Sequence, residues 1–226
     1  LPEPVTPPEV PPVVVGAGPA GLFAALVLAR AGARPILLER GRRVEDRTTD
    51  VERFWSTGEL DLTSNVQFGE GGAGAFSDGK YNITNQFGGT LHEYIGKKQA
   101  LELMEYVDEI NVANGGEGTH LYSTGATPIK KLCLENDLHL LDASVRHLGT
   151  DINYVVLENL YAYLKDKVTF YFDTPVESVA AVDGGYQVTC KAGSFSCSQC
   201  VISVGRSGSK WMESVCRDMD IPTKSN

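Results

Sequence analysis

Apolar and polar positions alternate in blocks that predict strands and helices in turn at the start of this chain. Val13–Val15 is an uninterrupted apolar run with the length of a short buried strand. The apolar positions that follow recur with helical spacing and predict the helix Pro19–Ala31: Leu22, Ala25, Leu26 and Ala29. Gly32 ends this helix, and Ile36–Glu39 is a second strand. The chain therefore opens with a strand, a helix and a strand.

Further helices are predicted from apolar stripes and from start signals. Val44–Thr57 is helical and forms a local cap that separates Glu39 from later glycines. Thr90 and Glu93 have capping-box spacing and begin one long helix that continues to Asn114. A short helix is predicted to begin at Thr127 and Pro128. A longer helix is predicted to be capped by Asp151 and to reach Leu164.

Strands dominate after that helix. Val168–Phe172 reads as a parallel strand that follows its crossover helix. Val176–Val182 and Tyr186–Lys191 form a hairpin, and Phe195–Val204 brings the chain back into the sheet. The pattern predicts an α/β fold: a Rossmann-like, doubly wound parallel sheet with a β-hairpin crossover and a partly helical insertion.

Composition narrows the class of protein. The 226 residues are 42% hydrophobic, enough for an ordinary packed core. A net charge of −9 disfavours binding to nucleic acid or to an anionic membrane, and no apolar run is long enough to span a bilayer. Five cysteines without regular spacing favour a reducing cytoplasm over a secreted disulfide framework. Residues 1–12, LPEPVTPPEVPP, predict an extended proline-rich linker.

The first strand runs into a nucleotide-binding motif. Gly16, Gly18 and Gly21 have G-x-G-x-x-G spacing between a strand and a helix, where they allow a tight turn, close approach of a diphosphate and close packing of the helix. The helix N-terminus, with Pro19 and Ala20, then faces the phosphates. Glu39, eighteen residues after Gly21, is expected to accept hydrogen bonds from the adenosine ribose and to disfavour NADP.

Two later segments carry a family resemblance. Asn65 begins NVQFGEGGAGAFSDGK, and Val201 begins VISVGRS. Both resemble segments of a poorly characterised family of FAD-dependent dehydrogenases, within the glutathione-reductase-like flavoprotein superfamily. The resemblance implies FAD rather than NAD, a backbone contact from Val176 to the adenine, and passage of the nucleotide by Gly205. A buried valine at a strand start is an equal alternative for Val176.

The expected cofactor-binding residues come from both glycine-rich segments and from the resemblance. In the second segment, glycines let the backbone lie flat on a planar ring, while Ser77 and Lys80 offer polar contacts. The full set is Gly16, Gly18, Pro19, Ala20, Gly21, Glu39, Arg40, Gly72, Ala73, Gly74, Ser77, Gly79, Lys80, Val176 and Gly205.

Lys80 and His147 are the candidate catalytic residues. Lys80 could stabilise negative charge on a reduced flavin, with a solvated surface lysine as the alternative. His147 follows Arg146, which stands where the family usually has proline, and either faces the substrate or is a satisfied polar group. Cys197 and Cys200 have C-x-x-C spacing, but they precede a strand, which disfavours a redox role. No metal site is expected.

Family members are longer at both ends, so the resemblance implies a fragment. Its expected parts are the linker 1–12, a FAD-binding part 13–89, a helical insertion 90–144 toward the substrate, and a continuation 145–226. The expected function is a FAD-dependent oxidoreductase that transfers hydride through flavin N5 to or from an unassigned small molecule, with NAD(P)H as a candidate donor. An NAD-binding dehydrogenase and a non-catalytic nucleotide-binding module remain alternatives.

Overall fold

The computed structural model describes residues 3–125 and 127–224 of the chain. The chain divides into two compact units. The first contains the residues up to Ala75 and those from Leu160 onward, and the second is Phe76–Asn159. The sequence predicts an insertion over residues 90–144, and the second unit of the structure extends beyond this range at both ends.

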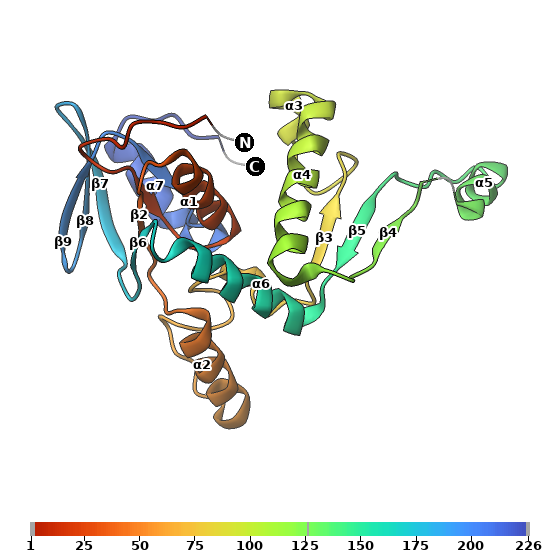
Figure 1. The fold of residues 1–226 in the computed structure, drawn as a ribbon, viewed down its shortest axis with the longest axis horizontal. Coiled ribbons are helices and arrows are strands. Elements are labelled where there is room, and N and C mark those ends of the chain that lie inside the picture. Colours follow the sequence, from red (N-terminus) through yellow and green to blue (C-terminus); the bar gives the residue numbers. More distant parts are fainter. Residues whose placement is uncertain (1–2, 126, 225–226) are drawn as a thin grey trace. The chain divides into compact units, whose positions relative to one another are not determined.

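A four-stranded parallel sheet organises the first unit, in the order β10-β1-β2-β6. Figure 1 labels two of its strands, β2 and β6. Its strands are β1 (Val13–Val15), β2 (Ile36–Leu38), β6 (Thr169–Tyr171) and β10 (Cys200–Ile202). In the register of the sheet, Val14 lies beside Leu37 and Val201. The side chains of β1 are almost fully buried, which explains why the sequence shows an apolar run without alternation. The predicted α/β fold with a parallel sheet is confirmed.

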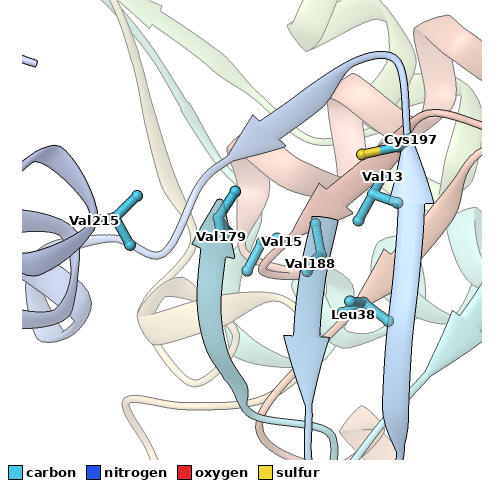
Figure 2. Packing of buried hydrophobic residues seen from close by; sticks show 7 residues of the cluster. All are labelled: Val13, Val15, Leu38, Val179, Val188, Cys197 and Val215. Carbon is cyan, nitrogen blue, oxygen red and sulfur yellow. The ribbon is translucent and has the colours of Figure 1, made fainter. Parts of the chain in front are cut away.

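A second sheet of the first unit is antiparallel, in the order β7-β8-β9. It contains β7 (Val176–Val182), β8 (Gly185–Cys190) and β9 (Gly193–Cys197). Figure 2 shows the core between the two sheets, where Val179 of β7 and Val188 of β8 face Val15 of β1. Val215, on the helix α7 (Ser209–Asp218), belongs to the same buried cluster.

Two helices of the first unit have the bounds that the sequence predicts. Helix α1 (Pro19–Ala31) ends at Gly32, which adopts a left-handed φ of 89° and donates its N–H to the carbonyl of Ala29. Helix α2 (Val44–Thr57) also has the predicted bounds and ends at a left-handed glycine. Two short 3₁₀ turns, Gly72–Gly74 and Arg206–Gly208, lie beside loops of the same unit.

The second unit contains helices and a small antiparallel sheet in the order β3-β5-β4. The strands are β3 (Lys80–Ile83), β4 (Leu121–Ser123) and β5 (Ser144–His147). The helical elements are α3 (Leu91–Ile95), α4 (Lys97–Asn111), a π-helical turn Val112–Gly116 and α5 (Pro128–Glu135). Helix α6 (Gly149–Leu164) begins in this unit, and its last residues belong to the first unit.

Several predicted details are wrong. The long helix after Thr90 is broken at Gly96, whose φ of 83° does not fit an α-helix, and the Thr90 side chain makes no capping hydrogen bond. Asp151 lies in the first turn of α6 and does not cap it, because the helix begins at Gly149. The predicted strand 195–204 is two strands, since β9 joins the hairpin sheet and β10 the parallel sheet.

Within residues 3–125 and 127–224, none of the helices combines the length and the apolar character that crossing a bilayer requires.

Candidate functional site

The first glycine-rich turn joins β1 to α1 in a tight bend. Gly16 has a φ of 100°, and a Cβ on it would lie 2.6 Å from the carbonyl oxygen of Ser203. Gly18 occupies the N-cap position of α1, and no side chain caps the helix there. Pro19 follows in the first turn, where its missing N–H costs nothing. The start of α1 therefore presents backbone groups rather than side chains.

The second glycine-rich segment packs directly on this turn. Gly71 donates its N–H to the carbonyl of Ala17 over 2.8 Å. A Cβ on Gly72 would lie 3.1 Å from the Cα of Gly18 and 3.3 Å from Pro19, so only a glycine fits easily between them. The 3₁₀ turn Gly72–Gly74 begins at this contact. The two motifs, remote in sequence, form one surface of backbone atoms.

Glu39 ties three backbone segments together. The residue is 5% exposed. One carboxylate oxygen accepts from the N–H of Ala17 at 2.7 Å, and the other accepts from Gly41 at 2.9 Å and Gly69 at 3.1 Å. A carboxylate has about four acceptor positions, so these three bonds leave capacity for a sugar hydroxyl. The structural role of Glu39 was not foreseen from the sequence.

The end of β10 closes the opposite side. The Ser203 hydroxyl donates to the carbonyls of Val15 at 3.0 Å or Gly16 at 3.2 Å, which fixes β10 against the first turn. Gly205 has a φ of 64° and leads into the 3₁₀ turn Arg206–Gly208. On α7, the indole N–H of Trp211 donates to the carbonyl of Glu177.

These segments surround a pocket of about 810 Å³ within the first unit. This volume lies in the range of cavities that hold small molecules and cofactors. Most of the residues predicted to bind a cofactor line it: Gly16, Gly18, Pro19, Ala20, Glu39, Arg40, Gly72, Ala73, Gly74, Val176 and Gly205.

Other predicted residues do not line this pocket. Gly21 lies behind the turn, against the backbone of Gly16. Ser77, Gly79, Lys80 and His147 belong to the second unit.

In that unit these residues form a linked group of their own. Gly79 donates its N–H to the Ser77 hydroxyl, and the ammonium of Lys80 lies 2.6 Å from the carboxylate of Asp78. Lys80 is paired with His147 in the register of β3 and β5. The hydrogen bond from Lys80 lowers the pKa of Asp78.

Several lining residues were missed by the sequence reasoning. Phe68 lies in the pocket with the guanidinium of Arg40 over its ring, at 3.9 Å from the ring centroid. Thr174, Ser203 and Trp211 also line the pocket. Phe68 lies in the second glycine-rich segment and Ser203 lies near the end of a predicted strand, but neither position reveals from the sequence which side chain turns into the pocket.

The C-x-x-C pair is structural in character. All five cysteines are free, and Cys197 ends β9 while Cys200 begins β10. Burial raises the pKa of both thiols, to about 12 for Cys200, which suppresses the reactive thiolate. Among residues 3–125 and 127–224, no group of three or more His, Cys, Asp or Glu side chains could hold a metal ion.

Comparison with known proteins gives a family and a fold. Residues 12–200 match the model of a family described as FAD binding domain. An uncharacterized protein of Clostridium beijerinckii is 38% identical over 210 residues, which cover 92% of this chain and 33% of that protein. The chain therefore spans about a third of the length of this relative.

Among solved structures, glycine oxidase from Geobacillus kaustophilus aligns with a TM-score of 0.55 and 15% identity. The alignment covers 92% of this chain and 57% of the oxidase. L-proline dehydrogenase from P. horikoshii aligns with a TM-score of 0.43 and 15% identity, over 99% of this chain and 58% of that one. At such identities, the likeness to glycine oxidase shows the fold alone.

Proposed function

We propose that this chain, which belongs to the FAD binding domain family, is the cofactor-holding part of a FAD-dependent oxidoreductase. FAD is its cofactor. The observation that carries the proposal is the meeting of Gly18 and Gly72 at the edge of one pocket, where side chains are absent and backbone can approach a diphosphate closely. When bound, FAD supplies two-electron chemistry, which we propose is hydride transfer at flavin N5.

The residues present fit this cofactor. Cβ atoms on Gly16 and Gly72 would crowd the turn, and the start of α1 offers amide donors and a partial positive charge that suit the diphosphate. The carboxylate of Glu39 retains acceptor capacity for a ribose hydroxyl. Val176 and Gly205 line the same pocket, in keeping with the proposed contacts to adenine and to the nucleotide.

Binding of the cofactor is tested by absorption spectroscopy. We expect the purified protein to be yellow or to become so when incubated with FAD, with the visible flavin spectrum retained after gel filtration. A colourless protein that cannot be reconstituted with FAD would refute the proposal. NAD⁺ binding without flavin would instead support the NAD-binding dehydrogenase.

Turnover is tested separately by anaerobic reduction. We propose NAD(P)H as one candidate donor, and the bleaching of bound flavin by NADH or NADPH would identify it. Reduction by dithionite, but by no member of a panel of small organic donors and nicotinamides, would favour a nucleotide-binding module without catalysis. Lys80 and His147 are the proposed catalytic candidates, and their exposed positions on paired strands leave both accessible to a small substrate.

The proposed setting is a reducing compartment such as the cytoplasm, in keeping with five free cysteines. We propose a small-molecule substrate and no nucleic-acid or membrane partner. A net charge of −9 would be repelled by the negative charge of nucleic acid and of an anionic membrane.

A further inference from the structure

Arg47 is a fully buried arginine in the first turn of α2, with 0% of its surface exposed. Burying a guanidinium is costly unless its donors are satisfied. The sequence gives no reason for this burial, because α2 reads as a local cap with a polar surface. The explanation for the burial of Arg47 lies in the groups that surround its guanidinium.

Three backbone carbonyls of the second glycine-rich segment accept hydrogen bonds from Arg47. Its Nε donates to Asn65 over 2.9 Å, and Nη2 donates to Gly72, also over 2.9 Å. Nη1 donates to the carbonyl of Glu70, which lies between them. One planar, rigid group thus holds the first half of the segment at three points, Asn65, Glu70 and Gly72.

The segment holds α2 in return. The carboxylate of Glu70, whose side chain is 1% exposed, accepts from the N–H of Val44, the first residue of α2, over 3.0 Å. This places an anion at the helix N-terminus, where it is favourable. Burial lowers the pKa of Arg47 to about 10, and the charges of Glu39 and Glu70 oppose that shift, so Arg47 is a cation at neutral pH.

The contacts of Arg47 set the direction of the peptide units that it holds. The carbonyl of Glu70 points to Arg47, and the N–H of the same planar unit, on Gly71, points the opposite way and donates to Ala17. Next to it, Gly69 donates to Glu39. A Cβ on Gly69 would lie 2.3 Å from Cδ of Arg47, so a side chain at position 69 would clash with the buried arginine. By holding the Glu70 carbonyl, Arg47 therefore orients the Gly71 N–H toward the first glycine-rich turn.

We propose that Arg47 is a positioning residue that fixes residues 69–74 in the conformation that receives FAD before FAD arrives. The inference rests on the proposed function, because it assigns the pocket to FAD. A segment with so many glycines has high conformational entropy when it is not held. Holding it in advance removes an ordering cost that binding would otherwise carry.

The test compares FAD binding to FAD-free wild type and three variants, measured by quenching of flavin fluorescence. We expect Arg47→Met to weaken FAD binding at least tenfold. Arg47→Lys should weaken it less, because an ammonium still donates to some of the carbonyls. Arg53→Met is the matched control, since this half-exposed arginine of α2 pairs with Asp50 and Asp61 and donates no hydrogen bond to residues 65–72.

Two results would overturn the proposal. One is an Arg47→Met protein that binds FAD as tightly as Arg53→Met. The other is equal weakening by Arg47→Met and Arg47→Lys, which would show that burial volume matters and hydrogen bonding does not. Wild type that binds no FAD would refute the proposed function instead.

Hydrogen exchange on FAD-free wild type keeps the proposal testable even where Arg47→Met does not fold. We expect slow exchange at the amides of Gly69 and Gly71, which donate to Glu39 and Ala17. Exchange at the rate of an unprotected loop would contradict a segment that is fixed before FAD binds.

Discussion

A methyl group on Gly21 would lie 1.8 Å from the carbonyl oxygen of Gly16. The Ser203 hydroxyl would lie 2.7 Å from the same methyl group. Helix α1 thus packs against the end of β1 with no room for a side chain. The third glycine of the first motif serves helix packing, and it does so without lining the pocket.

Gly21→Ala should therefore destabilise the fold rather than only the site. The backbone oxygen of Gly16 cannot move aside as a flexible side chain would, so α1 must shift away from the sheet. We expect a loss of about 3 kcal/mol in the free energy of unfolding, the upper part of the usual range for overpacking. Urea unfolding of the FAD-free protein measures it, and an unchanged midpoint would contradict the packing described.

Gly18→Ala should weaken FAD binding strongly and lower the stability of the fold only slightly. The nearest atom to a Cβ on Gly18 is the Cα of Gly72 at 3.9 Å, and its φ of −69° suits alanine. We expect a stability loss of about 1 kcal/mol, as for alanine at an N-cap, with at least a tenfold loss of FAD affinity because the methyl group occupies the pocket lining. Fluorescence titration together with urea unfolding separates the two effects, and unchanged affinity would contradict the assignment.

The sequence predicted the parts of the fold that depend on local pattern. The bounds of α1 and α2 and the parallel strands β1, β2 and β6 all follow from periodicity and glycine signals. The small sheet of the second unit was missed because β4, Leu121–Ser123, is exposed along its length and shows no alternation. The break at Gly96 was missed because one glycine inside a helical pattern is usually tolerated.

The residues of the candidate site were likewise predictable only where they belong to a local sequence motif. The glycines and Glu39 stand in a motif whose spacing has a physical meaning. Arg47 could not be recognised, because its partners Asn65, Glu70 and Gly72 are carbonyls distant in sequence. A backbone acceptor leaves no mark on residue type, so a buried arginine of this kind resembles any charged residue on a polar helix.

Replacing Glu39 with glutamine should lower stability even without FAD. The carboxylate accepts three backbone N–H groups in a buried position, and the amide nitrogen of glutamine would face one of these donors. We expect a loss of about 2 kcal/mol in the free energy of unfolding, because a buried donor is left unsatisfied. Glu45→Gln is the control, since Glu45 is exposed and pairs with Arg43 at the surface. Equal stability of the two variants would contradict the structural role of Glu39.

Cys200 should make the folded protein sensitive to alkaline pH. Burial raises its pKa to about 12 from an ordinary value near 9. Between these values the unfolded chain loses the proton and the folded chain keeps it. The contribution of Cys200 to stability is therefore fully present below about pH 9, and it declines as the pH rises toward 12. We expect Cys200→Ala to flatten the fall of the urea midpoint over this range, and parallel pH profiles for the two proteins would contradict the shift.

The same shift predicts slow alkylation. Iodoacetamide reacts with the thiolate, so native Cys200 should be modified far more slowly at pH 8 than the same residue in guanidinium-denatured protein. Peptide mass spectrometry after timed quenching measures both rates. Equal rates in native and denatured protein would contradict the protected thiol, and would revive a redox role for the C-x-x-C pair.

Arg146 should be a structural residue, in contrast to its neighbour His147. Its Nε and Nη2 donate to the two carboxylate oxygens of Asp108 at 2.5 and 2.7 Å, and Nη1 donates to the carbonyl of Thr119 at 2.9 Å. The hydrogen bond to Asp108 raises the pKa of Arg146, which keeps the pair ionised as the pH rises. Both side chains are nearly buried, at 12% and 11% exposed. The fork therefore joins β5 to α4 and to the loop before β4.

Arg146→Ala should consequently cost about 3 kcal/mol of stability, because it leaves the carboxylate of Asp108 buried without its cation. His147→Ala, at an exposed position, should change the free energy of unfolding by less than about 0.5 kcal/mol. A double-mutant cycle with Asp108→Asn isolates the pair, and an interaction energy near zero would show that the two groups act separately. If His147→Ala abolished substrate-driven flavin reduction at unchanged stability, the adjacent residues would have distinct tasks, with Arg146 holding the strand on which His147 meets the substrate.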